Sequence, residues 1–317
     1  RKNPEKSYII IEAREELGGT WSLFKYPGIR SDSDMYTFGF SFKTWDNPKS
    51  FADAPNILKY LDEAANEYNI KDKIRYQTKV VKANFDTQKK MWSISTKNKN
   101  NTEEIFYSRF LFSCTGYYNY DEGYTPDYKG INNFEGKVIH PQHWPENLDY
   151  KNKKVVVIGS GATAVTIVPE MAEKTSEITM LQRSPTYVGA FPNNDKYAQL
   201  IKKYFPKKIA HKLIRFKNIF VQILFFQACK IWPNYLKKLL VNAAQRQLGD
   251  FPAKPHFEPN YNPWDQRFCV APDGDLFKAI RKGRANVVTD KIDSFDKNGI
   301  KLSSGKKLEA DIIISAT

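Results

Sequence analysis

Cysteine and histidine are scarce in this sequence, with three cysteines and four histidines among 317 residues. Cys114, Cys229 and Cys269 lie far apart and form neither a CxxC pair nor a disulfide framework, which favours a reducing, cytoplasmic compartment. We expect all three to be buried as small apolar side chains. The histidines are equally scattered, so no metal site is expected.

Acidic residues are absent from the stretch between Lys196 and Arg246. This stretch contains twelve lysines and arginines, and the formal net charge of the chain is +14, so the remainder contributes only 14 − 12 = +2. No nucleic-acid-binding motif accompanies the charge, and nucleic acid is therefore not an expected partner. The apolar run Ile219–Cys229 is shorter than the ~20 residues that a membrane span needs.

Two interpretations of residues 196–246 are open. Basic residues around an apolar helix are typical of peripheral contact with anionic lipid, here on the inner face of the cell membrane. Alternatively, the stretch belongs to a helical insertion, roughly residues 195–250, whose apolar face packs on the protein core. We favour packing, because apolar helical segments of soluble chains usually bury their stripe internally.

A strand, a glycine turn and a helix are predicted within Lys153–Lys174, which contains VVVIGSGATA. Gly159 suits the tight turn, Gly161 leaves room for a pyrophosphate, and the small Ala164 lets the helix pack on the strand. The phosphates would meet free N–H groups at the start of the helix. The residues expected to contact this dinucleotide are Gly159, Ser160, Gly161, Ala162, Thr163, Ala164 and Val165.

The strand predicted next, within Glu177–Tyr187, lacks the carboxylate that holds the ribose of NAD. Gln182 and Arg183 stand at its end instead. Arg183 can form a charge-assisted bond with a 2′-phosphate, so the sequence favours NADPH over NADH.

An acid does end the first predicted strand, where Glu12 follows the apolar run Tyr8–Ile11. A carboxylate in this position holds the ribose of a nucleotide that carries no 2′-phosphate, and FAD is the natural candidate. The glycine loop of such a unit should lie roughly 20 residues upstream, yet only eleven residues precede Glu12. We therefore expect the sequence to be a fragment of a longer product.

These features predict an α/β fold with two Rossmann-like, three-layer dinucleotide-binding domains. Residues 1–145 would form an FAD domain, and residues 146–295 an NADPH domain that contains the helical insertion. Residues 296–317 would return to the FAD domain and end in a buried strand. An amphipathic helix is expected over Ala54–Ile70 and a meander of strands over residues 74–116.

The segment FEGKVIHPQHWP, Phe134–Pro145, resembles the fingerprint of the flavoprotein Baeyer–Villiger monooxygenases in its spacing F-x-G-x-x-x-H-x-x-x-W-P. Further segments resemble motifs of that family in the same order, namely GGTW, YPGIRSDSDMY, GSGATAV, LQRSPTY and YNPWDQR. The resemblance implies an enzyme that uses FAD, NADPH and O₂. A C4a-peroxyflavin would insert one oxygen atom into a ketone, or oxidise the sulfur of a thioether or thioamide.

The resemblance also implies roles for single residues. Arg267, in NPWDQR, corresponds to an arginine that stays charged beside the oxygen-loaded flavin, and Asp32, in GIRSDSD, to the acid that orients it and contacts the cofactors. The other implied contacts are Gly19, Thr20 and Trp21 at the flavin ring, Val80 at the adenine, and Arg30 and Ser31 at the nicotinamide nucleotide. Simpler alternatives are a surface Arg267 paired with Asp265, and an Asp32 that only forms a turn.

Other functions remain in competition with this one. A flavin monooxygenase that oxygenates nitrogen or sulfur would share both domains, and a non-catalytic, membrane-associated fragment is a second alternative. A flavin disulfide reductase needs two neighbouring cysteines, which the sequence lacks. His140 is expected to stabilise the placement of the two domains by hydrogen bonds rather than to act as a base.

Overall fold

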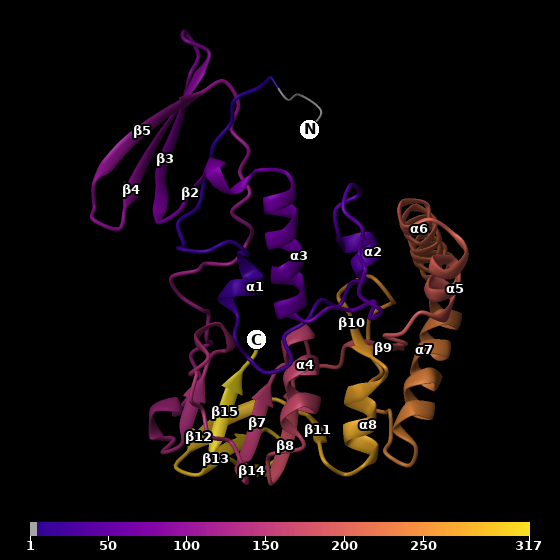
Figure 1. The fold of residues 1–317 in the computed structure, drawn as a ribbon. Helices are drawn as coiled ribbons and strands as arrows, with labels where there is room; N and C mark the ends of the chain where they lie inside the picture. The colour runs from indigo at the N-terminus through magenta and orange to yellow at the C-terminus, as the bar shows by residue number, and fades with distance from the viewer. Residues whose placement is uncertain (1–4) are drawn as a thin grey trace. The chain divides into compact units, whose positions relative to one another are not determined.

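The computed structural model describes residues 5–317, which divide into two compact units (Figure 1). Unit 1 comprises Arg1–Leu23 and Pro55–Asp121, and unit 2 comprises Phe24–Ala54 and Glu122–Thr317. Each unit contains sheets of its own.

A five-stranded parallel sheet forms the centre of unit 2, with the strand order β11–β8–β7–β15–β6. These strands span, in that order, Asn286–Thr289, Glu177–Gln182, Lys154–Ile158, Ile312–Ser315 and Lys137–Ile139. The central strands β7 and β15 are buried along almost their whole length. Their continuous apolar runs are those of a parallel sheet that is covered on both faces.

Two further layers cover this sheet. Helix α4 (Ala162–Met171) packs on β7 and β8, with α8 (Asp275–Arg281) beside it. On the opposite face, the antiparallel strands β12 (Ile292–Asp296), β13 (Gly299–Leu302) and β14 (Lys307–Glu309) share a core with the sheet, built from residues such as Phe295, Ile300, Val156 and Ile313. The three layers confirm the expected α/β dinucleotide-binding fold for unit 2.

The last strand belongs to the sheet of unit 2. β15 pairs in parallel with both β7 and β6, and residues 296–317 lie within unit 2, whereas the sequence analysis expects them in the FAD domain. The strand is expected to be buried, and it is: all four of its residues are buried. Between two hydrogen-bonded neighbours, both of its edges are satisfied, which is why this apolar run belongs here.

Three helices form the insertion expected near residues 195–250: α5 (Lys196–Tyr204), α6 (Lys207–Ile231) and α7 (Pro233–Leu248). Asp195 begins α5 by accepting hydrogen bonds from the backbone N–H groups of Tyr197 and Ala198. The parallel pair β9 (Tyr187–Phe191) and β10 (Phe268–Pro272) flanks the insertion. Among residues 5–317, no helix combines the length and the apolarity needed to cross a bilayer.

Unit 1 is smaller. β1 (Ile10–Ile11) pairs in parallel with β2 (Ile74–Arg75), and β3 (Thr78–Asp86), β4 (Met91–Asn98) and β5 (Glu103–Ser108) form an antiparallel meander. Its helical elements are α1 (Thr20–Leu23), most of α3 (Ala54–Glu67) and the short η1 (Lys71–Lys73). The amphipathic helix expected over Ala54–Ile70 is therefore present, three residues shorter.

The expected meander ends early, and one cysteine prediction is wrong. Residues 109–116 form no strand, because no described strand pairs with them. Cys114 lies in this segment and is exposed, whereas Cys229 and Cys269 are buried as expected. An apolar run becomes a buried strand only where a neighbour satisfies its backbone.

Candidate functional site

The glycine turn between β7 and α4 has the geometry of a phosphate loop. Gly159 has a φ of +137°, and a Cβ at this position would collide with the carbonyl oxygen of Ala316. A Cβ on Gly161 would collide with Nη1 of the Arg267 guanidinium. Ala164 is fully buried beneath the turn, as a close contact between helix and strand requires. The turn thus offers a bare backbone and a guanidinium at the start of α4, where an anion is favoured.

The residues after β8 lie beside this turn. The Ser160 hydroxyl donates to the Ser184 carbonyl at 3.2 Å and lies 3.1 Å from Oγ1 of Thr186. Arg183 is exposed at the end of the strand, as a contact with a 2′-phosphate requires. Gln182, by contrast, is buried, and its amide nitrogen donates to the His256 carbonyl at 2.7 Å and to Thr289 Oγ1 at 2.8 Å. The structure therefore gives the Gln182 amide nitrogen two acceptors inside unit 2.

The segment that carries Arg30 and Asp32 runs along α4. The hydroxyl of Tyr26 hydrogen-bonds to Thr163 in the first turn of the helix, and burial raises the pKa of that hydroxyl. Gly28, at a φ of +73°, packs on Glu170 and Thr166 of the same helix. The backbone N–H of Ser31 donates to the Ala52 carbonyl at 2.8 Å. These contacts bring the expected nicotinamide-binding residues to the helix of the glycine turn, within one unit.

Arg30 has one paired and one unpaired nitrogen. Its Nη1 donates to Oδ2 of Asp275 at 2.5 Å, while Nη2 is buried and has no hydrogen-bond partner. A buried donor without a partner carries a free-energy cost that a bound acceptor would relieve. The Ser31 hydroxyl, in contrast, forms a local turn with Ser33. Arg30 therefore suits a ligand contact, and Ser31 shapes the backbone.

Asp32 and Arg267 both act on the buried thiol of Cys269. Burial, together with the charge of Asp32, raises the pKa of Cys269 to about 12, and the charge of Arg267 opposes the shift. Partial desolvation also raises the pKa of Asp32, although its side chain reaches solvent; its own backbone N–H and the charge of Arg30 oppose this. The structure thus brings Asp32 and Arg267 close to one thiol, with no ion pair between these two described side chains.

The alternative interpretation, an ion pair between Arg267 and Asp265, is not what the structure shows. Asp265 forms an ion pair with Lys230 at 2.7 Å, and within residues 5–317 no ion pair to Arg267 is found. Its guanidinium instead lies against Gly161. An exposed cation at a glycine turn, without a carboxylate partner, is available to a bound anion.

Apart from Asp32, which belongs to unit 2, the expected FAD residues lie in unit 1. Glu12 follows β1, and its Oε1 accepts from the backbone N–H of Arg14 at 2.9 Å. Gly18 (φ +125°) and Gly19 (φ +54°) form the turn before Thr20 and Trp21, which begin α1. Val80 lies at a bulge of β3, at the point where its pairing with β4 shifts.

Arg14 holds the Gly18–Gly19 turn and was not expected from the sequence. Its Nη1 donates to the Gly19 carbonyl at 2.9 Å and to Ser22 Oγ at 2.6 Å. Tyr26 and Cys269, in the site of unit 2, were also missed. Tyr26 and Cys269 matter through contact partners that are distant in the sequence, whereas the partners of Arg14 lie only five and eight residues further on.

The fingerprint segment has a packing role in unit 2. A Cβ on Gly136 would collide with the Asp311 carbonyl, next to β15. His140 caps the short helix η3 (Pro141–His143) by accepting from the backbone N–H of Gln142 at 3.1 Å, and its ring packs against Gly123. Burial lowers the pKa of His140, and the charge of His143 acts in the same direction. The segment thus supplies β6, an edge strand of the parallel sheet, and the capped helix η3 that follows it.

Residues 12–227 match the family of flavin-binding monooxygenase-like proteins, which is more than half of the chain. The chain belongs to this family. It is 52% identical, over 99% of its length, to the FAD-containing monooxygenase EthA of Mycolicibacterium smegmatis, and it spans 64% of that relative. The expected flavin monooxygenase family is thereby confirmed.

Solved structures show the same fold. OTEMO in complex with FAD and NADP superposes with a TM-score of 0.75 at 23% identity, covering 100% of this chain and 67% of that one. Cyclohexanone monooxygenase with bound ε-caprolactone superposes with a TM-score of 0.77 at 18% identity, covering 98% of this chain and 68% of that one. At such identities the likeness of this flavin-binding monooxygenase-like chain to these enzymes is one of fold.

Proposed function

We propose that the whole protein to which this chain belongs is an FAD- and NADPH-dependent monooxygenase of the Baeyer–Villiger type. The observation that carries the proposal is the Arg267 guanidinium, which lies against Gly161 of the phosphate loop in the same unit as Arg30 and Asp32. The curated relative is a FAD-containing monooxygenase, and OTEMO was crystallised with FAD and NADP. Binding of both cofactors by this chain is part of the proposal.

The residues of both units fit these cofactors. In unit 2, the bare turn at Gly159 and Gly161 would receive the pyrophosphate of NADPH, and Arg183 its 2′-phosphate. In unit 1, Glu12 and the Gly18–Gly19 turn would hold FAD. Bound FAD would supply the oxygen activation and NADPH the hydride.

The contribution of this chain is charge and position. Arg267 keeps its positive charge at any physiological pH and offers its donors in a rigid fork, so it would stabilise negative charge without donating its proton. Asp32 would orient the reactants near that cation. Arg30 would satisfy its unpaired Nη2 on the nicotinamide nucleotide.

We propose a ketone as the substrate, with a thioether or thioamide as the second class. The fold shared with cyclohexanone monooxygenase, which was crystallised with a lactone, supports the ketone. Oxygenation of nitrogen or sulfur alone is the competing activity. The full-length, FAD-loaded protein should consume NADPH and yield an ester or lactone from at least one ketone of a ketone and thioether panel. Peroxide as the sole product would refute the proposal.

A second proposal concerns the outer face of α6, which points to peripheral contact with anionic lipid at the inner face of the cell membrane. Exposed apolar residues recur there at helical spacing: Ile209, Leu213, Phe216, Phe220, Ile223 and Leu224. The buried residues Ala210, His211, Ile214 and Cys229 lie on the opposite side, so the exposed stripe is not the one that packs on the protein. The exposed Lys208 and Lys212 accompany the stripe, and α6 itself contains no acid. An apolar stripe among lysines suits an anionic bilayer surface.

Vesicle flotation of the full-length protein tests this contact. We expect flotation with vesicles that contain phosphatidylglycerol but not with pure phosphatidylcholine, and loss of flotation in Phe216→Ser/Phe220→Ser. Ile105→Ser/Tyr107→Ser, which alters an exposed apolar pair on β5, is the matched control. Absence of flotation, or flotation unaffected by the Phe216→Ser/Phe220→Ser change, would contradict the lipid contact. The stripe would then be covered by a protein partner or by another part of the full chain.

A further inference from the structure

Side chains on the inward face of α6 hold a second, very short helix by hydrogen bonds. Arg215, Asn218 and Gln222 recur at a spacing of three and four residues, so they lie on one face of α6. All three side chains reach α2 (Met35–Phe38), which packs against α6. A helix of four residues is not stable by itself, so its form depends on such outside contacts.

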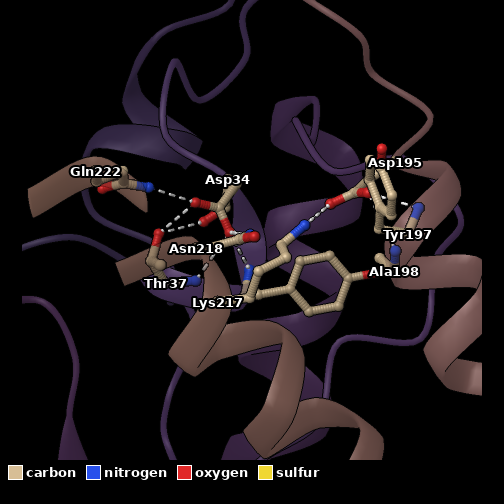
Figure 2. Close-up of polar contacts among 9 residues, drawn as sticks. Asp34, Thr37, Asp195, Tyr197, Ala198, Lys217, Asn218 and Gln222 are labelled. Atoms are coloured by element: carbon tan, nitrogen blue, oxygen red, sulfur yellow. Dashed lines mark hydrogen bonds and ion pairs between the residues drawn. The ribbon is translucent and has the colours of Figure 1, made fainter. Parts of the chain in front are cut away.

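At the N-terminus of α2, Asp34 receives donors from two sources (Figure 2). The backbone N–H groups of Tyr36 and Thr37 donate to its Oδ1 at 3.1 Å each, and the Thr37 hydroxyl donates to Oδ2 at 2.6 Å. From α6, Asn218 Nδ2 donates to Oδ1 at 2.8 Å and Gln222 Nε2 to Oδ2 at 2.9 Å. Asp34 is only 7% exposed, so these bonds replace nearly all of its hydration.

At the C-terminus of α2, one guanidinium serves three acceptors. Arg215 Nη1 donates to the carbonyl oxygens of Tyr36, Thr37 and Gly39 at 2.6, 3.1 and 2.9 Å. These carbonyls lack partners within so short a helix, and a cation at a helix C-terminus is favourable. One face of α6 therefore holds α2 at both ends.

A short, constrained backbone segment connects α2 to Arg30 and Asp32 of the candidate site. Asp34 follows Asp32 by two residues, and the side chain of Ser31 forms the turn between them. Ser31 and Met35 are also tied by their backbone N–H groups to the carbonyls of Ala52 and Ser50, at 2.8 Å each. With both ends of α2 fixed, little freedom is left to the Arg30–Asp32 segment.

We propose that Arg215, Asn218 and Gln222 are positioning residues that set the place of Arg30 and Asp32 at the nicotinamide and flavin cofactors. This inference rests on the proposed function. The helical insertion thus acts on the chemistry through α2, without touching the reactants. A misplacement of a reacting group by about 1 Å can cost roughly 10²-fold in rate. The hydrogen bonds from α6 to α2 can therefore govern the coupling between NADPH oxidation and oxygenation.

The test uses the full-length, FAD-loaded protein with Asn218→Leu/Gln222→Met, and separately the milder Gln222→Met. The control is Lys217→Met on the same helix, which breaks the 2.5 Å ion pair of Lys217 with Asp195 at the start of α5 (Figure 2). The control thus removes a tie of α6 to α5 and none to α2. We expect about tenfold faster hydrogen exchange over residues 31–39 in the double variant, and a smaller increase in the single variant.

The functional measurements should show the same ranking of the variants as hydrogen exchange. We expect the double variant to divert NADPH into hydrogen peroxide, with a roughly tenfold lower kcat for oxygenation, a weakened affinity for NADP⁺ and an unchanged flavin spectrum. Lys217→Met should keep wild-type coupling. Unchanged hydrogen exchange over residues 31–39 would contradict the claim that α6 holds α2 in place. Faster exchange with wild-type coupling would contradict the positioning role. A wild-type protein that does not oxygenate would contradict the proposed function instead, and exchange and NADP⁺ affinity would then decide the inference.

Discussion

At the scale of single residues, we propose different roles for two arginines of unit 2, Arg267 and Arg183. Arg267 lies against Gly161 without a carboxylate partner among the described residues, and Arg183 stands exposed at the end of β8. A guanidinium beside a reacting oxygen acts in the transition state, whereas one at a ribose acts in binding. The two should therefore affect different kinetic constants.

Replacing Arg267 should slow the chemistry and leave FAD binding unchanged. We expect Arg267→Met to lower kcat for oxygenation by about 10²–10³-fold, the usual effect of removing one electrostatic stabiliser. The FAD spectrum should remain unchanged. Arg284→Met, which removes an exposed arginine paired with Glu173, is the control and should keep its rate. Undiminished ester formation by Arg267→Met would contradict the role of this cation.

Replacing Arg183 should change cofactor preference. A hydrogen bond to a charged group contributes about 1.5–3 kcal/mol, so Arg183→Ala should weaken NADPH binding roughly ten- to hundredfold. NADH has no 2′-phosphate and serves as the internal control. Isothermal titration of both nucleotides measures the difference, and an equal loss for both would place Arg183 elsewhere.

At the scale of elements, β15 decides the extent of unit 2. Ile313 is fully buried and packs with Val156 and Phe295, so it joins the parallel sheet to the antiparallel layer. Unit 2 therefore depends on residues near the end of the sequence, which the sequence analysis expects in the FAD domain.

Shortening Ile313 should destabilise unit 2. We expect Ile313→Ala to lower the free energy of unfolding by about 2–5 kcal/mol, because the substitution removes buried methyl groups and leaves a cavity. Urea unfolding followed by tryptophan fluorescence measures this loss. Val81→Ala, at a half-exposed position of β3, should cost far less. Equal effects of the two changes would refute the assignment of β15 to the core.

At the scale of the whole molecule, three histidines should couple stability to pH. Burial lowers the pKa of His140, His211 and His256, and nearby positive charges act in the same direction: His143, Arg215 and Lys306 respectively. The unfolded chain therefore binds more protons than the folded chain below the ordinary histidine pKa of about 6.5. Stability is complete above that pH and falls as the pH decreases through the range between the two pKa values.

Thermal unfolding between pH 7.5 and pH 5 tests this coupling. We expect the unfolding temperature to fall on acidification, and His256→Gln to reduce the slope, since glutamine does not titrate. A pH-independent unfolding temperature would contradict the prediction.

Local pattern determined much of this protein. The strand, glycine turn and helix around Gly159–Ala164, the helix from Ala54 and the helical character of the insertion all follow from residues adjacent in the sequence. Periodicity, glycine backbone freedom and helix capping act over a few residues, which is why the sequence alone reveals them. The basic, acid-free character of residues 196–246 is equally a property of the sequence.

Only the tertiary structure decided which distant residues meet. The contact of Arg267 with Gly161 spans more than a hundred residues, and that of Arg215 with Gly39 spans 176. The addition of β15 to the sheet beside β6, and the exposure of Cys114, likewise depended on whether a partner strand was in place. Side-chain contacts and strand pairing are formed by the folded chain as a whole, so no local pattern encodes them.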